Sequence, residues 1–251
     1  MIVIPMAGLS SRFSKVGYDL PKYMLPLKGH TVFDYSVASF RSVFDVEPFL
    51  FIGLARDGMR EFISDHASAL GIGEFSIVIL DKPTAGQAET VVRGVSAVSC
   101  SGSEPITIFN IDTFNVGGHS PIFQSFPKAA GVLEVFRGDG DNWSFVAPDP
   151  VDTSAVARTT EKIPISDLCS TGLYYFKSFD HLKIAYDSEI NSPQAAELYV
   201  APLYNHLIRR GMDVRYYEVE RKDIIFCGVP SEYEELRQDE QSLPKLSLQP
   251  R

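Results

Sequence analysis

The stretch IPMAGLSSRF, residues 4–13, runs from a short apolar strand into a loop of small residues that ends in an arginine. The small residues of this loop are Ala7, Gly8, Ser10 and Ser11. Their size lets backbone N–H groups approach an anion closely, and Arg12 adds a fixed fork of donors for the same charge. Because ligands collect beyond the carboxyl ends of strands in a doubly wound sheet, the loop is well placed to bind a phosphate.

Two common glycine-rich phosphate loops are excluded by the spacing. A dinucleotide-binding fold needs G-x-G-x-x-G directly before a helix, and a P-loop needs G-x-x-x-x-G-K-[ST]; the segment has neither. The chain instead continues past Gly17, Pro21, Pro26 and Gly29 before we expect any helix to begin, since each proline removes a donor and fixes φ. Such long irregular segments are usually functional or disordered, and Lys22 directly after Pro21 favours a functional one.

The composition is that of an ordinary globular protein. The chain has 251 residues, 45% hydrophobic and 22% charged, with no apolar run long enough to span a membrane and no secretory signal pattern at its start. We therefore expect a cytoplasmic protein without a membrane partner. Cys100, Cys169 and Cys227 have no C-x-x-C spacing, so a zinc site is not predicted and the thiols are expected to be reduced and structural.

The charge is unevenly distributed along the chain. Residues 1–28 contain four basic residues and one acid, a balance of +3, whereas the whole chain carries −9 and the remainder therefore −12. A small cationic patch on an acidic protein suits a compact anionic ligand better than a nucleic acid. We therefore expect no nucleic-acid partner, although scattered surface charges would give the same count.

Strand and helix patterns alternate in the first part of the chain. Short apolar runs typical of buried strands occupy residues 1–5, 48–54, 75–80 and 106–112. Helical spacing occupies residues 31–44, 56–70 and 87–98. This alternation predicts parallel strands joined by right-handed crossovers, hence an α/β fold with a doubly wound, mostly parallel sheet.

The rhythm changes after about residue 112. Strands of a mixed sheet are predicted at 129–137, 143–148, 154–162, 169–177 and 213–220, and helices at 179–190, at 194–211 with an interruption at Pro202, and from Pro230. We expect one domain over residues 1–241. The domain would consist of two halves, 1–115 and 116–241, with a tail at 242–251.

Several motifs together resemble the signature of the sugar-phosphate nucleotidyltransferases, which join an NTP to a sugar phosphate or another small phosphate. The decisive pair is P-M-A-G-L-S-S-R-F followed by P-K-Y-M-L-P-L, similar to the family's A-G-x-[GS]-[ST]-R and P-K elements. Further similar segments are PTAGQAET (83–90), IFNID (108–112), EKIPISDLCSTGLYYF (161–176) and GVPSEY (228–233). The resemblance covers most of the chain and implies a nucleotide-diphospho-sugar transferase-like fold. It also implies that the half at 1–115 binds nucleotide and the half at 116–241 an acceptor.

The resemblance implies roles for the residues of the first half. Ala7, Gly8, Ser10 and Ser11 would cradle the triphosphate, with Arg12 on its outer phosphates. Lys22 would lie between the donor and acceptor phosphates and stabilise the charge that develops there. The alternative for Lys22 is a solvated surface lysine.

Asp112 follows an apolar strand, where a carboxylate has no evident structural task. A Mg²⁺ ion bridging it to the α-phosphate would supply one, because Mg²⁺ prefers one or two carboxylates with phosphate oxygens. A strand-end cap is the alternative. The family's second metal aspartate is replaced by Phe226, which puts a two-carboxylate site in doubt, and Asp223 is only a weak substitute.

The base-binding segment gives a weaker indication. In the family that the chain resembles, the residue that contacts the base often lies five positions before the glycine of this segment. That glycine is Gly86 here, so the resemblance points to Asp81. A carboxylate only accepts hydrogen bonds and therefore suits an amino group such as cytosine N4. This favours CTP and leaves UTP, dTTP and GTP open. Gln87 is a second candidate for base contact, and Asp81 is equally plausible as a surface residue.

The acceptor side is predicted from the E-K pair. Glu161 would accept from hydroxyls and Lys162 would bind the acceptor phosphate, while Thr171 and Gly172 would allow close approach and Glu197 would accept from another hydroxyl. Cross-strand or surface charges are the alternative for the charged members.

The sequence leaves three functions to be considered. The first is a Mg²⁺-dependent nucleotidyltransferase that releases pyrophosphate and activates a small phosphate for polysaccharide or lipid assembly. The second is a glycosyltransferase of related fold, which would leave the A-G-x-S-S-R and P-K elements without a reason. The third is a non-catalytic nucleotide sensor, which Phe226 makes conceivable. The sequence leaves self-association into a homo-oligomer open.

Overall fold

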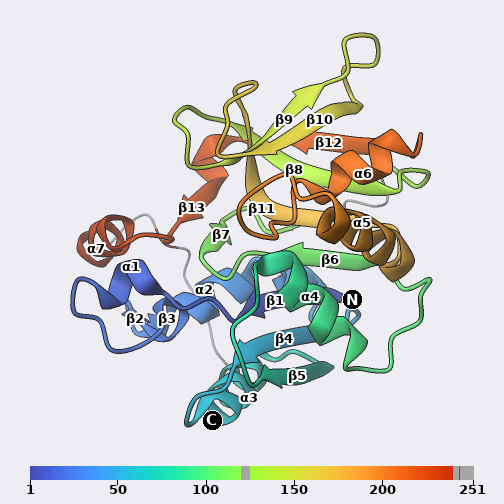
Figure 1. Ribbon diagram of the computed structural model, residues 1–251. Helices are drawn as coiled ribbons and strands as arrows, with labels where there is room; N and C mark the ends of the chain where they lie inside the picture. Colours follow the sequence, from blue (N-terminus) through green and yellow to red (C-terminus); the bar gives the residue numbers. More distant parts are fainter. Residues whose placement is uncertain (120–124, 240–242, 244–251) are drawn as a thin grey trace. The chain divides into compact units, whose positions relative to one another are not determined.

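A computed structural model of the chain describes residues 1–119, 125–239 and 243. The predicted tail at 242–251 lies outside the described residues apart from Leu243. Within the described part, nine strands form one sheet whose main order is β10-β9-β11-β6-β1-β4-β5, with β8 paired to β11 and β12 to β8 (Figure 1). The pairs β1–β6, β4–β5 and β8–β12 are parallel. The α/β fold with a mostly parallel sheet is thus confirmed.

The chain divides by its internal contacts into two units that interleave along the sequence. The first unit contains residues 1–3, 84–109 and 121–221, and the second contains 4–83, 110–120 and 222–251. The division of the domain into halves at 1–115 and 116–241 stays a prediction. None of the described helices is long and apolar enough to cross a bilayer.

The first unit combines antiparallel and parallel strands with three helices. Strand β1 (Ile2–Met6) starts in this unit and pairs in parallel with β6. The other strands are β6 (Ile106–Phe109), β8 (Gly131–Arg137), β9 (Ser144–Pro148), β10 (Val156–Glu161), β11 (Leu168–Phe176) and β12 (Val214–Glu218). The helices are α4 (Gln87–Ser96), α5 (Phe179–Asn191) and α6 (Leu203–Arg209). Helix α5 packs against α4 and α6, and α6 contacts β10 and β12.

The second unit is built around a βαβ arrangement, β4–α3–β5. Its strands besides the end of β1 are β2 (Pro26–Leu27), β3 (His30–Thr31), β4 (Phe49–Leu54), β5 (Phe75–Leu80), β7 (Thr113–Asn115) and β13 (Ile224–Phe226). Its helices are α1 (Ser11–Ser14), α2 (Val32–Ala38), α3 (Met59–Leu70) and α7 (Pro230–Gln238), with 3₁₀ turns η1 (Lys22–Met24) and η2 (Arg41–Val43). The turn η4 (Arg221–Asp223) joins the two units in sequence.

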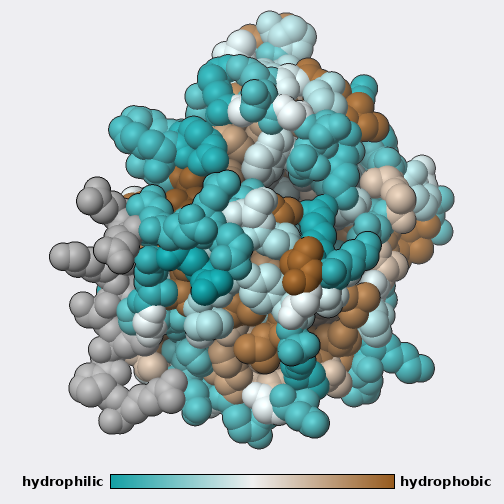
Figure 2. Space-filling view, turned by 90° about the vertical axis from the view of Figure 1, so that its left-hand side faces the viewer, coloured by the Kyte–Doolittle hydropathy of each residue, from teal (hydrophilic) through white to brown (hydrophobic). Residues whose placement is uncertain are grey.

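A core cluster lies beneath the N-terminal loop in the second unit. Its buried members are Phe13, Leu25, Leu27, Val32, Tyr35, Phe114, Cys227, Tyr233 and Leu236. They come from six separate stretches of sequence, so this core fixes the loop against the C-terminal helix α7. Figure 2 shows a face on which hydrophilic residues predominate and apolar ones form small scattered groups, as is ordinary for a protein surface.

Several predicted elements are shorter in the structure, and three of them show why. The helix expected at 31–44 ends at Ala38 and continues as the 3₁₀ turn η2. The strand expected at 106–112 ends at Phe109. The helix expected at 194–211 forms only from Leu203, directly after Pro202, because the preceding backbone pairs elsewhere: Leu198 bonds to Ala85 and Ala88.

The prediction that no helix begins before Gly29 was wrong. The four-residue helix α1 follows Ser10, and η1 follows Pro21. Both are single turns without the apolar period that sequence reasoning looks for. Each turn is held by a buried side chain. Phe13 of α1 is 1% exposed and packs in the core cluster, whereas Tyr23 of η1 is buried at a separate position.

Candidate active site

The N-terminal loop has a left-handed residue at its centre. Ser10 has φ 50° and ψ 33°, a conformation uncommon for residues with a Cβ, and α1 begins at the next residue. Phe13 then turns into the core and anchors the loop. The fold of the loop is thus fixed by one strained residue and one buried ring.

The loop leaves its donors available. Within the described part of the chain, the backbone N–H groups of Gly8, Leu9 and Ser10 donate no hydrogen bond, and Gly8 and Leu9 are exposed. Arg12 is exposed and has no described partner. A Cβ at Gly8 would have nothing within 4 Å, so open space lies beside its backbone. These groups form a cationic, donor-rich surface suited to phosphate oxygens.

Lys22 links this loop to Asp112. Its backbone N–H donates to the Ser10 Oγ at 3.2 Å, and its side-chain ammonium donates to an Asp112 carboxylate oxygen. The two side chains are 23% and 21% exposed, so the ion pair is accessible to solvent and to a ligand. The structure therefore brings together the loop, the lysine and the aspartate that the sequence analysis singled out in three separate segments.

The backbone of Asp112 is held by the C-terminal turn. Strand β13 pairs with β7, and beyond it the Cys227 N–H donates to the Asp112 carbonyl at 2.8 Å. The Glu232 carboxylate accepts from the N–H groups of Gly228, at 2.7 Å, and Val229, at 3.1 Å. A Cβ at Gly228 would lie 3.1 Å from the Asp112 Oδ2, a tight contact that would require a small shift of that carboxylate.

Helix α7 holds the loop on both sides of Lys22, which the sequence analysis did not foresee. The Tyr18 hydroxyl donates to the Glu234 carboxylate, and the Tyr233 hydroxyl donates to the Pro26 carbonyl at 2.6 Å. The rings of Phe13, Tyr18 and Tyr233 meet edge to face, with centroids 5.6–6.2 Å apart. Burial raises the pKa of Tyr233 to about 12, so its hydroxyl stays a donor at neutral pH.

The donor set around Asp112 fits a single-carboxylate metal site. Among residues 1–119, 125–239 and 243, no three His, Cys, Asp or Glu side chains gather as a metal-binding group. Phe226 pairs with Thr113 where the family pattern has an acid, and the Glu232 oxygen nearest Gly228 already accepts two backbone N–H groups. Mg²⁺ bound by one carboxylate and substrate phosphates needs no more protein ligands than Asp112 supplies.

The base-binding segment belongs partly to each unit. Asp81 is exposed and directly follows β5 in the second unit. In the first unit, Gly86 is required for close packing, because a Cβ there would lie 2.5 Å from the Leu198 carbonyl oxygen. Gln87 begins α4. The roles of these residues in base contact stay predictions.

The predicted acceptor residues form a polar cluster in the first unit. Lys162 has a left-handed φ of 56°, and its ammonium donates to the Tyr199 hydroxyl at 2.6 Å, which in turn donates to Glu197 at 3.0 Å. Glu161 accepts from the Ser144 hydroxyl. Burial raises the pKa of Glu161, and the Ser144 hydrogen bond and Lys162 oppose that shift. Sequence reasoning missed Tyr199, whose signal would have been an aromatic beside Glu197.

Thr171 and Gly172 lie in an irregular part of β11. The pairing of β11 with β8 shifts register between Ser170 and Tyr174, and Gly172 adopts φ 94° there. Thr171 is 1% exposed, and its hydroxyl donates to the buried Glu134 at 2.7 Å. Both residues thus shape the strand, and the Thr171 hydroxyl already has a protein partner.

The chain is similar to the nucleoside-diphosphate-sugar pyrophosphorylase from Vibrio cholerae RC9, whose crystal structure is known. The two share 45% sequence identity, covering 95% of this chain and 100% of that chain, with a TM-score of 0.89. The chain belongs to the nucleoside-diphosphate-sugar pyrophosphorylase family. No protein-family model and no curated protein matches it.

More distant members of this fold show the same architecture. The inositol-1-phosphate CTP transferase from T. maritima is 17% identical, with 97% of each chain covered and a TM-score of 0.70. The UDP-glucose pyrophosphorylase from Acinetobacter baumannii is 16% identical, with 94% of this chain and 90% of that chain covered and a TM-score of 0.66. At these identities the similarity concerns the fold alone.

Proposed function

We propose that the protein is a nucleotidyltransferase that joins an NTP to a sugar phosphate or similar small phosphate and releases pyrophosphate. The observation that carries the proposal is the chain of contacts from Ser10 to Lys22 to Asp112, which places an ammonium and a carboxylate beside the donor-rich loop. The 45% identity to a nucleoside-diphosphate-sugar pyrophosphorylase supports the same reaction class.

The chemistry accounts for this set of residues. An oxygen of the acceptor phosphate attacks the α-phosphorus of the NTP, a new P–O bond forms, and the bond to the departing pyrophosphate breaks. Both reactants are anions, so catalysis consists largely of aligning them and neutralising their charge. The N–H groups of residues 8–10 and the Arg12 guanidinium bind the triphosphate. Lys22 stabilises charge at the reacting phosphates after leaving Asp112.

Asp112 is the residue that would hold Mg²⁺. When bound, the ion would neutralise charge on the α-phosphate. The chain's own contribution is to fix the aspartate: the Cys227 N–H holds its backbone, and Lys22 holds its carboxylate.

The nucleotide and the acceptor are assigned by residue chemistry. We favour CTP, because the exposed Asp81 can only accept and so suits an amino group on the base. For the acceptor, Lys162 binds the phosphate, while Glu161 and Glu197 accept from hydroxyls. The product would be an activated nucleotide sugar or similar compound of the kind used in polysaccharide or lipid assembly.

The test is pyrophosphate release by the purified full chain with each NTP and a panel of sugar phosphates. Lys22→Ala should lower turnover by about a hundredfold or more, roughly 3 kcal/mol of transition-state stabilisation. Lys15→Ala is the matched control, since Lys15 is an exposed lysine that caps α1 through its backbone. Full activity of Lys22→Ala would refute the role given to Lys22, and nucleotide binding without turnover for any pair would favour the sensor.

The metal assignment has its own test. Asp112→Asn keeps the shape of the side chain but removes the charge that Mg²⁺ and Lys22 both need, so we expect Mg²⁺-dependent activity to be lost. Magnesium titrations of the wild-type and variant proteins measure this. An unchanged dependence on Mg²⁺ would show that the metal is held elsewhere.

A further inference from the structure

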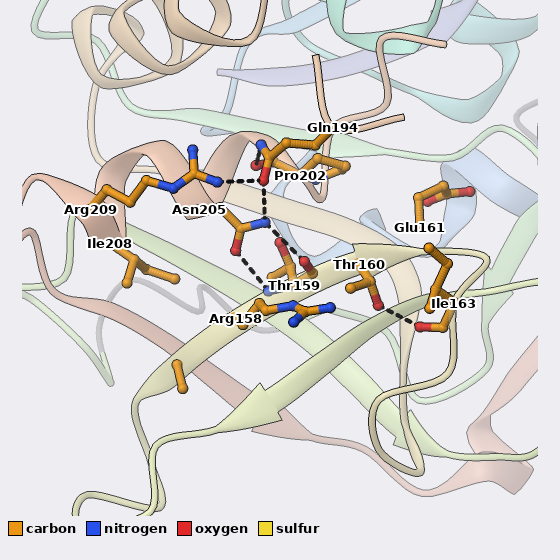
Figure 3. A pocket seen from close by; sticks show the side chains of 11 residues that line it. Arg158, Thr159, Thr160, Glu161, Ile163, Gln194, Pro202, Asn205, Ile208 and Arg209 are labelled. Carbon is orange, nitrogen blue, oxygen red and sulfur yellow. Dashed lines mark hydrogen bonds between the residues drawn. The ribbon is translucent and has the colours of Figure 1, made fainter. Parts of the chain in front are cut away.

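A cavity of about 400 Å³ lies between the edge strand β10 and helix α6, entirely within the first unit (Figure 3). Its size lies in the range of sites that take small metabolites, roughly 300–1,000 Å³. The lining residues that matter below are Arg158, Ile163, Gln194, Pro202, Ile208 and Arg209. Arg12, Lys22 and Asp112 do not line it.

The wall of this cavity is built in advance of any ligand. Asn205 of α6 satisfies the free edge of β10, accepting from the Thr159 N–H at 2.8 Å and donating to the Thr159 carbonyl at 2.9 Å. Gln194 accepts from Asn205 at 2.9 Å and donates to the buried Glu189 at 2.6 Å. Because these amides are locked by one another, the space beside them is a fixed feature of the fold.

Two guanidinium groups border the cavity, and neither has a carboxylate partner among the residues that the structure describes. Arg209 bonds to the neutral Gln194 amide oxygen, at 2.9 Å, and to His206. The side chain of Arg158 has no hydrogen bond or ion pair within the described part of the chain. Figure 3 shows Arg158 extending along β10 and Arg209 coming from α6. Elsewhere in the same unit, Arg137 and Arg215 each contact two carboxylates.

The carboxylate that lines the cavity does not neutralise these arginines. Glu161 accepts from the Ser144 hydroxyl, and Figure 3 shows its carboxylate directed away from Arg158 and Arg209. Two fixed positive charges in a protein of net charge −9 therefore border one preformed space. Ile163, Pro202 and Ile208 add an apolar surface to it.

We propose that this cavity binds a small organic anion, a phosphate ester or a carboxylate, with Arg158 and Arg209 on the charged group and the apolar residues on its carbon chain. Guanidinium groups match both anions through paired N–H donors. The site shares no residue with the loop, Lys22 or Asp112. It has Glu161 in common with the proposed acceptor site, but the Glu161 carboxylate bonds to Ser144 and is directed away from both arginines.

The test uses n-butyl phosphate and pentanoate, two anions with a similar apolar chain, and inorganic phosphate as a probe that lacks the chain. Binding is measured by titration calorimetry on the full chain in an Arg12→Gln, Lys22→Ala background, which removes the phosphate-binding groups of the loop. The two organic probes separate a phosphate-ester site from a carboxylate site. Either organic anion should bind with one site per chain and more tightly than inorganic phosphate.

Arg158→Gln and Arg209→Gln should each raise the dissociation constant of the bound probe at least tenfold. Arg210→Gln is the matched control, since Arg210 is the exposed neighbour of Arg209, bonds to Ser188 and does not line this cavity. Arg158 has no described partner, so its replacement does not endanger folding. Unchanged affinity in Arg158→Gln, equal loss in Arg210→Gln, or no binding of either organic anion would overturn the proposal.

Discussion

Ser10 combines two features whose contributions can be separated by substitution. Its backbone is left-handed, with φ 50°, and its hydroxyl accepts from the Lys22 N–H at 3.2 Å. Left-handed backbone costs about 1–2 kcal/mol in a residue with a Cβ and is allowed freely in glycine. The hydrogen bond contributes about 1 kcal/mol. The cost of the left-handed backbone and the stabilisation by the hydrogen bond thus have similar size and opposite sign.

These magnitudes predict an order of stability among three variants. Ser10→Gly relieves the backbone and loses the hydrogen bond, so its free energy of unfolding should stay within about 1 kcal/mol of the wild type. Ser10→Ala keeps the strain and loses the hydrogen bond, which should cost about 1 kcal/mol. Ser10→Thr keeps the hydroxyl but places a β-branched side chain in left-handed backbone, and it should be the least stable.

Activity should follow a different order from stability. Both Ser10→Gly and Ser10→Ala release the Lys22 backbone from the loop, so we expect turnover to fall by about tenfold in each, a loss of roughly 1.4 kcal/mol of transition-state stabilisation. Stability is measured by urea unfolding and turnover by pyrophosphate release. The expected split is a glycine variant that is stable but impaired.

Two results would refute this reasoning. If Ser10→Ala and Ser10→Thr unfold at the same urea concentration as Ser10→Gly, the backbone at residue 10 is not left-handed. If Ser10→Gly turns over at the wild-type rate, the hydrogen bond to Lys22 does not position that residue. The first result tests the backbone conformation of Ser10 and the second tests its hydrogen bond to Lys22, so the two features are tested separately.

Two further predictions concern the first unit. Gly86→Ala should destabilise the protein by about 1–3 kcal/mol in urea unfolding, because its Cβ would meet the Leu198 backbone at 2.5 Å; a neutral effect would mean that the two segments are not packed this closely. Burial raises the pKa of Glu161, so the folded state binds this proton more tightly than the unfolded state does. The stability that this group contributes is therefore fully present below its unfolded pKa and is lost as the pH rises through its folded pKa. Ser144→Ala removes a hydrogen bond that lowers this pKa, so carboxyl NMR should show Glu161 titrating at higher pH than in the wild type, and an equal or lower value would contradict the assignment.

The elements with strong local patterns could be predicted from the sequence. The apolar run FSIVIL gave β5 at its observed bounds, residues 75–80, because its β-branched and aromatic residues favour a strand locally. The burial expected for it was wrong, since β5 ends the strand order and only Leu80 is buried. The break at Pro202 was also predicted, since proline acts locally. The absence of a helix in the stretch before Pro202 was not predicted, because the Leu198 N–H donates to the Ala85 carbonyl and the Leu198 carbonyl accepts from the Ala88 N–H. Local helical spacing cannot reveal such a tertiary pairing.

The site could be predicted only in part. Motif resemblance named Lys22 and Asp112, and the structure places them in contact, but their 90-residue separation gives no local signal for the pairing. The contacts that support the site were not foreseen. The main ones are the hydrogen bond from the Tyr18 hydroxyl to the Glu234 carboxylate and the one from the Tyr233 hydroxyl to the Pro26 carbonyl. These are long-range contacts between ordinary aromatic residues, which look the same in sequence as any buried tyrosine.

The partial exposure of the Lys22–Asp112 pair bears on how the site would work. A fully buried ion pair would be costly to break, by several kcal/mol, because each charge would be left without solvent or a partner. With about a fifth of each side chain exposed, the pair lies between that case and a surface ion pair, which contributes about 1 kcal/mol or less. In the proposed mechanism, this contact would hold the ammonium beside the loop and would be exchanged for a phosphate oxygen when substrate binds. Partial exposure favours that exchange, whereas deep burial of Lys22 would oppose it.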